Sequence, residues 1–230
     1  MAIYKGNKKV VAVYKGSTPI NKIYKGSTLV FQKSGGGGST HLFEGTATGN
    51  FNLAINSQTI PITPDADGKW FYDTDETITS LDSAFYTQSA VTSVDLSNLD
   101  LSGISTSSMF EEASNITSIK FNNTKSMKLT VIANMFYNCK LLTSLDLSSF
   151  DTSDVKNVIS SFDGCSSLVS LDLSNFDMSN VTNLCYNMFK NCTSLSTIKC
   201  KQTFKDWCDL NKYSIQMQNI YATINWEIVD

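Results

Sequence analysis

One motif recurs about every 26 residues through the C-terminal half of the chain, and this repeat constrains the fold more than any other feature. Three copies are nearly identical and cover residues 91–97, 142–148 and 168–174, while divergent copies begin at Ile116 and Leu195. A period in the twenties with an L-x-x-L-x-L core is typical of a leucine-rich-repeat solenoid. A single coil of this kind cannot bury its apolar face, but a stack of coils can.

The apolar positions of the repeat are expected to form one interior column. They are residues 91, 94 and 96; 116, 119 and 121; 142, 145 and 147; 168, 171 and 173; and 195, 198 and 200. A second motif precedes each strand, and its phenylalanines are Phe85, Phe110, Phe136, Phe162 and Phe189. Between strands, Val155, Val158 and Ile159 recur at helical spacing, which predicts a short helical return with Ser153, or Ser179 in the next coil, as its cap.

The same repeat resembles a known family, the BspA-like leucine-rich repeats, with a consensus near L-T-S-L-D-L-S-x-F-D-T-S-x-V-x-x-M-x-x-M-F-x-x-C. Residues 142–153 and 135–139, together with Val155, match it closely. The resemblance covers roughly residues 80–202. It implies a surface protein, because such repeats occur on surface proteins of gut anaerobes and their parasites, and in virion proteins of tailed phages that infect those bacteria.

The chain departs from that consensus at three positions. Lys120 and Lys199 stand where Asp is usual, and Ala113 stands where Cys is usual.

The first 33 residues form a basic segment with a period of ten. They contain seven Lys and no acid, whereas the rest of the chain has eleven Lys against twenty-one acids, so the side-chain charges are +7 and −10. Each decapeptide predicts a strand that ends at a Lys-Gly turn. The Ile-Tyr-Lys-Gly-Ser-Thr decapeptides also resemble those of phage structural proteins.

A meander of about thirty residues cannot bury both of its faces alone, since isolated hairpins are marginal in water. We therefore expect this segment to anchor the chain or to oligomerise, through Ile3, Tyr4, Val13, Tyr14, Ile23, Tyr24, Val30 and Phe31. Two alternatives remain open: the lysines keep exposed strand edges soluble, or the meander folds onto the following domain.

A glycine tract at residues 34–40 predicts a flexible linker, natural or engineered, and marks a domain boundary. Strands are predicted after it at residues 51–55, 59–62 and 69–72. The expected organisation is a β-strand anchor at 1–33, the linker at 34–40, a β-rich cap at 41–80, the solenoid at 81–202 and a C-terminal cap at 203–230. The fold class is thus α+β and β-rich: a leucine-rich-repeat solenoid of about five coils with a small β-rich N-terminal cap, preceded by a short β-meander.

Composition argues against an enzyme, a metal site or a cofactor. The chain has no Arg and one His, His41, beside the linker, so no Ser/His/Asp constellation is expected. Asp65 and Asp67 lack the other ligands of a calcium loop. Three of the six Cys (Cys139, Cys165 and Cys192) share one repeat position and are expected to stack as a buried ladder. Whether Cys200 or Cys208 forms a disulfide is left open.

Strand side chains that point away from the interior are the candidate ligand-binding residues, on the face expected to be concave. They are Ser93, Asp95, Ser118, Lys120, Ser144, Asp146, Ser170, Asp172 and Lys199. Small hydroxyls and carboxylates suit a loop, a peptide or a few sugars. The alternative is an ordinary solvated ladder without a ligand.

These features lead to one functional hypothesis and two alternatives. The leading hypothesis is a non-enzymatic phage virion protein (a head fibre, a capsid decoration or a tail component) that assembles in the host cytoplasm. Residues 1–33 would contact other virion proteins and form a dimer or trimer, and the solenoid would bind a host-surface protein or glycan. A bacterial cell-surface or secreted adhesin is the second possibility, and an intracellular protein-binding module is the third.

Neither a nucleic-acid partner nor membrane insertion is expected. The basic segment lacks Arg and is short, and no apolar run approaches the roughly 20 residues that a membrane span needs. The N-terminus also lacks the basic-then-apolar pattern of a signal peptide, which favours the virion over a secreted protein.

Overall fold

The structure is a computed structural model that describes four short strands within residues 14–32 and then residues 41–74, 76–181, 184–217 and 223–229. The four strands form two antiparallel hairpins, β1 (Tyr14–Lys15) with β2 (Thr18–Pro19) and β3 (Lys22–Lys25) with β4 (Thr28–Gln32). Strands separated by Lys-Gly turns were predicted for this segment. Ile3, Tyr4, Val13 and the linker at 34–40 lie outside the described residues, and Tyr14, Ile23, Tyr24, Val30 and Phe31 are described by their backbone alone.

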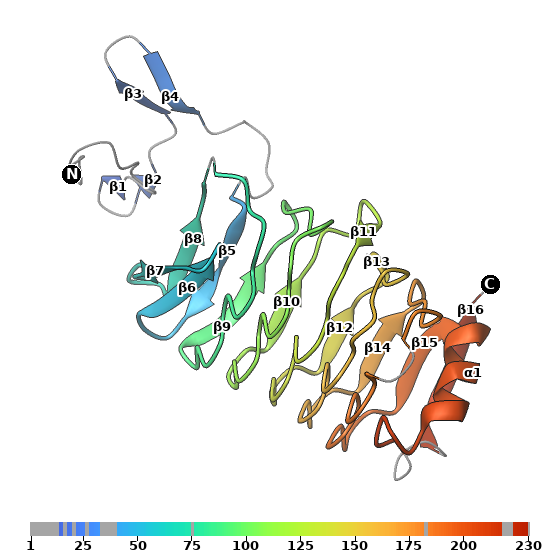
Figure 1. Ribbon diagram of the computed structural model, residues 1–230. Helices are drawn as coiled ribbons and strands as arrows, with labels where there is room; N and C mark the ends of the chain where they lie inside the picture. Colours follow the sequence, from blue (N-terminus) through green and yellow to red (C-terminus); the bar gives the residue numbers. More distant parts are fainter. Residues whose placement is uncertain are drawn as a thin grey trace.

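The β-rich cap contains the three predicted strands and one that was not predicted. Strands β6 (Phe51–Ile55), β7 (Gln58–Ile62) and β8 (Lys69–Tyr72) confirm the sequence pattern. The additional strand, β5 (Phe43–Ala47), lies between β8 and the first solenoid strand and pairs antiparallel with both. It thereby joins the cap to the solenoid in one sheet (Figure 1).

Five parallel strands carry the repeat and confirm the predicted solenoid of about five coils (Figure 1). They are β9 (Val91–Asp95), β10 (Ser118–Lys120), β12 (Ser144–Asp146), β14 (Ser170–Leu173) and β15 (Thr197–Lys201). β10 pairs with β9, and β12 pairs with β14, which pairs with β15. A second parallel pair, β11 (Met127–Lys128) with β13 (Phe150–Asp151), lies at another corner of the coils.

The predicted interior column is buried at every position except Ile119, which is half-buried. Ile119 lies on β10, where the sheet is interrupted before β12. The five phenylalanines of the second motif stack face to face, with ring centroids 5.1–5.8 Å apart and interplanar angles of 3–8°. This ladder extends through the whole stack, so each coil packs its largest side chain on the next.

The predicted helical return is wrong, because residues 159–164 form a series of turns and residues 155–158 contain no helix. Along the return, backbone amides alternate between two acceptors. The amides of Ser160 and Phe162 donate to carbonyls of the next coil at 2.9 and 3.0 Å, whereas the amide of Asp163 donates to the Ser160 carbonyl three residues back. The apolar spacing thus comes from turns that bury Val155, Val158 and Phe162, and Ser153 and Ser179 cap no helix.

The C-terminal segment closes the stack with a helix and one more strand. The helix α1 (Gln202–Asn211) buries Phe204 and Cys208, and Trp207 packs partly buried against the core. β16 (Asn225–Val229) then pairs parallel with β15 and extends the sheet by one strand. Across the described ranges, no helix has the length and apolar character of a membrane span.

Candidate functional site

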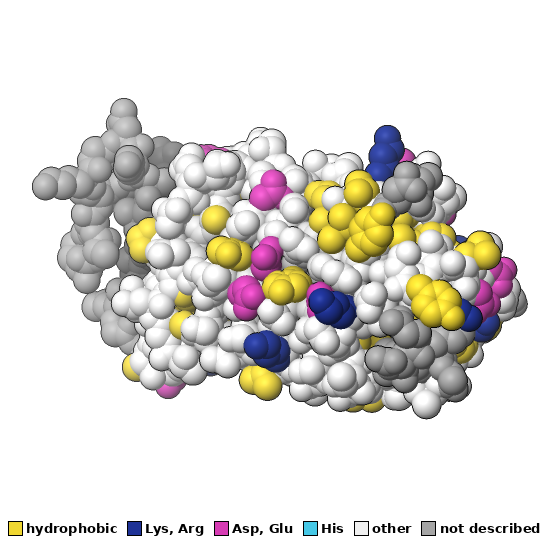
Figure 2. Space-filling model, turned by 60° about the horizontal axis from the view of Figure 1, so that its bottom comes forward, with side chains coloured by type: hydrophobic (Ala, Val, Ile, Leu, Met, Phe, Trp, Pro, Cys, Tyr) yellow, Lys and Arg dark blue, Asp and Glu magenta, His cyan; other side chains and the backbone are white. Residues whose placement is uncertain are grey.

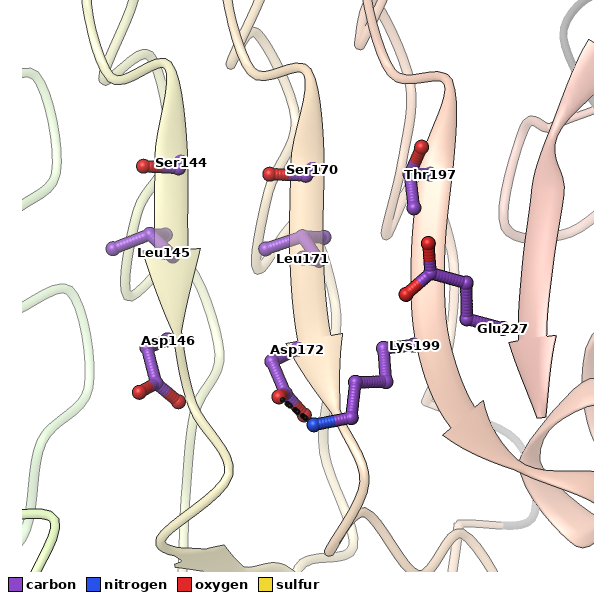
Figure 3. Close-up of a pocket in the computed structure, with 9 residues that line it drawn as sticks. All are labelled: Ser144, Leu145, Asp146, Ser170, Leu171, Asp172, Thr197, Lys199 and Glu227. Atoms are coloured by element: carbon purple, nitrogen blue, oxygen red, sulfur yellow. Dashed lines mark hydrogen bonds and ion pairs between the residues drawn. The ribbon is translucent and has the colours of Figure 1, made fainter. Parts of the chain in front are cut away.

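The outward side chains of the last four strands, β12, β14, β15 and β16, line a shallow open groove of about 340 Å³. Parallel pairing places equivalent residues of successive coils side by side, at the strand spacing of about 4.8 Å. One row contains Ser144, Ser170 and Thr197, and the next contains Asp146, Asp172 and Lys199 (Figure 3). We call this surface the sheet groove.

Five of the nine predicted binding residues meet in this groove, and four do not. The five are Ser144, Asp146, Ser170, Asp172 and Lys199. Ser93, Asp95, Ser118 and Lys120 lie on β9 and β10, which belong to the other sheet.

Ser93 is also engaged within the fold, because its hydroxyl accepts the backbone amide of Thr46 at 3.0 Å and contacts the Thr46 hydroxyl at 2.8 Å.

The aspartates of the repeat have a structural role that the sequence pattern left unnoticed. In Asp-x-Ser, a carboxylate oxygen accepts the backbone amide two residues later: Asp146 accepts from Ser148 at 3.0 Å and Asp172 from Ser174 at 3.1 Å. The same turn recurs at Asp95, Asp100, Asp151 and Asp177. Each aspartate therefore shapes a corner of its coil, which is the usual function of an Asx turn.

Two lysines that depart from the repeat consensus form ion pairs between coils. Lys199 Nζ lies 2.8 Å from Asp172 Oδ2, and Lys120 Nζ lies 3.1 Å from Asp95 Oδ2. Without them, aspartates of adjacent coils would stack as like charges, as Asp146 and Asp172 do in the register of β12 and β14.

These contacts shift the pKa values of the groups involved. Partial burial would raise the pKa of Asp172, but hydrogen bonds from Lys199 and Ser174 outweigh it and hold that pKa below its usual value. The pKa of Lys199 is raised, first by its hydrogen bond to Asp172 and then by the surrounding carboxylates. Both groups are therefore charged at neutral pH, and the groove presents a fixed pattern of charges.

The groove also contains Glu227, which sequence reasoning missed. Glu227 pairs in register with Lys199 across β15 and β16. The sequence does contain a signal for it, since the apolar residues Trp226 and Ile228 alternate with Glu227 and pair in register with the buried Ile198 and Cys200 of β15.

A second small pocket of about 190 Å³ is lined by Asn123, Thr124, Lys125, Ser126, Ser148, Ser149 and Asn175. It adjoins the sheet groove, because the Asn123 amide donates to Asp146 Oδ2 at 2.7 Å. Asn123 was also not predicted, since it lies in the divergent copy of the repeat.

The cysteines form the expected buried ladder. The thiols of Cys139, Cys165 and Cys192 donate to the carbonyls of Phe110, Phe136 and Phe162, one coil earlier, at 3.0–3.1 Å. All six cysteines are free and buried, including Cys200 and Cys208. Burial raises the pKa of these thiols, for Cys200 to about 11. Over the described part of the chain, no three His, Cys, Asp or Glu side chains cluster closely enough to hold a metal ion.

His41 lies on the cap, remote from any nucleophile of the groove. Its ring stacks on Phe71 with centroids 3.9 Å apart, and Nδ1 lies 2.6 Å from Asp73 Oδ2. The Asp73 carboxylate also accepts the backbone amide of Leu42 at 2.9 Å. This cluster fastens the start of the cap to the end of β8.

Comparison with known proteins gives one match. The family model described as "Mycoplasma protein of unknown function, DUF285" matches residues 104–225, which is more than half of the chain and includes coils two to five and the C-terminal helix. This family is related to the BspA-like repeats. Searches of curated proteins and of solved structures returned no match. The protein therefore belongs to the DUF285 family.

Proposed function

We propose that the protein is a non-enzymatic attachment protein whose solenoid binds a polar ligand in the sheet groove. The observation that carries this proposal is the groove itself: two rows of outward hydroxyls and charges at a regular spacing. A repetitive polar surface fits a repetitive polar ligand, such as a surface glycan or an extended peptide. We further propose that residues 1–33 attach the chain to a phage particle and that the solenoid projects from it.

Two features support the location on a particle. The basic decapeptide segment resembles those of phage structural proteins, and its charge is opposite to that of the remaining chain. A Gly-rich tract between them lets the two parts act independently. A cell-surface adhesin is the second candidate, and the match to a family described from Mycoplasma favours it.

The groove is tested with variants that remove charge and keep the fold. Asp146→Asn and Asp172→Asn retain the carbonyl oxygen that accepts the corner amide, so they leave the Asx turns in place. On a printed array of glycans and peptides, we expect the double variant to lose binding to the spots that the unaltered full-length chain binds. Asp67→Ala, on an exposed turn of the cap, is the matched control. If the double variant binds the array as the unaltered chain does, the groove is not the ligand-binding site.

The location is tested separately, by mass spectrometry of purified phage particles. Recovery of this chain at a fixed copy number relative to the major capsid protein supports a virion component. Recovery with the cell envelope and not with particles favours the adhesin instead.

A further inference from the structure

One row of outward side chains runs along the whole sheet surface of the solenoid, and carboxylates outnumber lysines in it. Strand pairing aligns its members within each sheet, and the repeat aligns Lys120 with Asp146 across the break between β10 and β12. The row, which we call the charged row, is Glu44, Asp95, Lys120, Asp146, Asp172, Lys199 and Glu227. With five carboxylates and two lysines, it has a net charge of −3 at neutral pH. The face in Figure 2 is different, because lysines, acidic side chains and groups of apolar side chains are interspersed there.

The lysines of the charged row neutralise only part of its negative charge. The ion pairs of Lys120 and Lys199 each neutralise one carboxylate. The other three carboxylates, those of Glu44, Asp146 and Glu227, take part in no ion pair among the described residues. Two of them, Asp146 and Glu227, are exposed and line the sheet groove. The groove therefore holds two carboxylates whose charge the fold leaves uncompensated.

Asp146 and Glu227 lie on either side of the ion pair between Asp172 and Lys199. Figure 3 shows Asp146 on one side of this pair, and on the other side Glu227, whose side chain reaches from β16 across β15. Both carboxylates are close enough to Lys199 that, after Asp172, their charges help to raise its pKa. The hydrogen bonds that Asp146 and Glu227 accept come from uncharged amide and hydroxyl groups, which leave the negative charge in place.

The row of hydroxyls beside these charges is also available to a ligand. The hydroxyls of Ser144, Ser170 and Thr197 form no hydrogen bond with any residue that the structure describes. A hydroxyl both donates and accepts, so this row suits the N–H and C=O groups of a peptide backbone laid across it. Leu145 and Leu171 also line the groove but are buried, so the groove offers polar contacts and no apolar anchor.

We propose that the ligand of the sheet groove is an extended basic peptide that places two lysine or arginine side chains against Asp146 and Glu227. This inference rests on the proposed function, because it names the ligand of the same groove. Three strand spacings, about 14 Å, separate the backbones of β12 and β16. In an extended chain, side chains four residues apart share a face and lie about 14 Å apart. The peptide thus crosses the strands of the groove with its backbone over the hydroxyl row.

Charge decides between the two kinds of ligand that a polar groove admits, a peptide and a glycan. A neutral glycan would displace water from the two carboxylates without supplying a cation, which costs free energy. An ammonium or guanidinium group forms charge-assisted hydrogen bonds with them instead. The uncompensated charge also attracts a basic segment before contact, as complementary charges do in other complexes.

Fluorescence anisotropy with the full-length chain and labelled peptides tests the charge and the spacing. The probe is a short Gly/Ser peptide, blocked at both ends, with two lysines four residues apart. A second peptide has glutamine in place of both lysines, and a third has the two lysines adjacent, so that in an extended chain they point to opposite faces. We expect the probe to bind about tenfold more tightly than the glutamine peptide and about threefold more tightly than the adjacent-lysine peptide, since each exposed ion pair contributes modestly.

A variant of the groove tests where the probe binds. Asp146→Asn combined with Glu227→Gln removes both uncompensated charges and keeps the oxygen that accepts the corner amide. The probe should then bind as weakly as the glutamine peptide. Asp67→Asn combined with Glu76→Gln, both exposed on the cap, removes the same net charge and should leave binding unchanged at physiological salt, where the Debye length is about 8 Å. Residues 1–33, with their own lysines, are present in every variant and do not affect the comparison.

The outcomes separate this inference from the proposed function. Equal binding of the lysine and glutamine peptides overturns the inference, as does a preference for lysine that the groove variant retains, because the basic peptide then binds elsewhere. Equal binding of the two lysine peptides overturns the spacing of the two contacts. Groove-dependent binding to glycans on the array, without binding to the probe, overturns the inference and leaves the proposed function in place. Both fail together if the groove substitutions change no binding at all.

Discussion

In each coil, two residues with positive φ flank the stacked phenylalanine, two positions before it and two after it. The pairs are Ser83 and Thr87, Ser108 and Glu112, Asn134 and Asn138, Ser160 and Gly164, and Asn187 and Asn191. Asn and Gly adopt this conformation readily, whereas Ser, Thr and Glu do so at a cost. The pairs recur in every coil because this backbone conformation directs alternate amides around the phenylalanine toward carbonyls of the next coil. The amides of Ser160 and Phe162, for example, donate to the carbonyls of Tyr186 and Met188.

Gly164 is the position where this geometry is least tolerant of a side chain. Its φ is +79°, and a Cβ atom would lie 2.1 Å from Asn138 Oδ1. Gly164→Ala should therefore lower the free energy of unfolding by about 2–4 kcal/mol, from backbone strain and the clash together. Gly103→Ala is the matched control, with φ of +73° and no atom within 4 Å of the new Cβ.

Chemical denaturation of both variants measures the difference. Gly103→Ala should lose about 1–2 kcal/mol, the cost of the conformation alone. Equal losses in the two variants would contradict the clash at Asn138.

Asp163 is a buried carboxylate whose ionised form lowers the stability of the fold. Burial raises its pKa, and the hydrogen bond from Asn191 and the charge of Lys190 offset this only in part. The folded state thus binds the proton more tightly than the unfolded state does, so the contribution of Asp163 to stability falls as the pH rises above the unfolded pKa of about 3.9. Asp163→Asn should raise the melting temperature at pH 7, with the gain vanishing near pH 3.

Asp151 provides the control with the opposite sign. Hydrogen bonds from Ser153 hold the pKa of Asp151 below its usual value, so its ionised form is stabilising above the unfolded pKa and this stability is lost as the pH falls through the folded pKa. Asp151→Asn should lower the melting temperature at pH 7. A lower melting temperature for Asp163→Asn at pH 7 would be inconsistent with the buried-charge explanation.

At the scale of the elements, the cysteine and phenylalanine ladders hold neighbouring coils together by different means. The rings contribute stacking, and each thiol donates to a carbonyl one coil earlier. Because the thiols are buried and their pKa values are raised, the thiolate is scarce and reagents have no access.

We therefore expect all six thiols to resist Ellman's reagent at pH 8 in the folded protein and to react together after denaturation. The time course of absorbance with and without guanidinium measures this. Rapid labelling of one or more thiols without denaturant would show that the ladder opens locally.

The elements differ in how well they could be predicted from the sequence. The strands of the repeat were predictable from L-x-x-L-x-L, because that spacing buries three side chains in each coil of a parallel stack. β5 was missed because Gly45 interrupts its pattern, and the reason for that glycine is tertiary: a Cβ there would lie 1.9 Å from the Ser93 carbonyl oxygen. The returns were misread as helices because successive turns can bury apolar residues at the same intervals as a helix does.

The candidate site was likewise predictable only in part. The alternation of side chains along a strand predicts which residues point outward, and the five predicted residues that line the groove are all outward positions. Which coils share a continuous groove was not predictable, because it depends on the break in pairing between β10 and β12. Glu227 entered the groove only through the pairing of β16 with β15.

For the whole molecule, the stack requires that both of its ends be covered. The cap sheet covers the first coil through β5, and α1 with β16 covers the last, burying Phe204 and Cys208. Deletion of residues 202–230 exposes the apolar end of the fifth coil and should lower the melting temperature and cause aggregation. Deletion of residues 1–33 should leave the melting of the solenoid unchanged, since a Gly-rich linker separates the two parts.

Differential scanning calorimetry and light scattering of the two truncated proteins distinguish these outcomes. A large loss of stability on removal of residues 1–33 would mean that this segment packs on the solenoid as part of its core.

The repeat alone determined that the chain stacks in coils, which side chains enter the interior and which cysteines align, because a fixed period and a fixed spacing of apolar residues leave one way to bury them all. Tertiary structure decided the rest: the turns with positive φ, the ion pairs of Lys120 and Lys199, and the backbone hydrogen bonds between the turns of successive coils. These depend on hydrogen bonds and charges between residues about 26 positions apart, whose partners are defined only when one coil lies on the next.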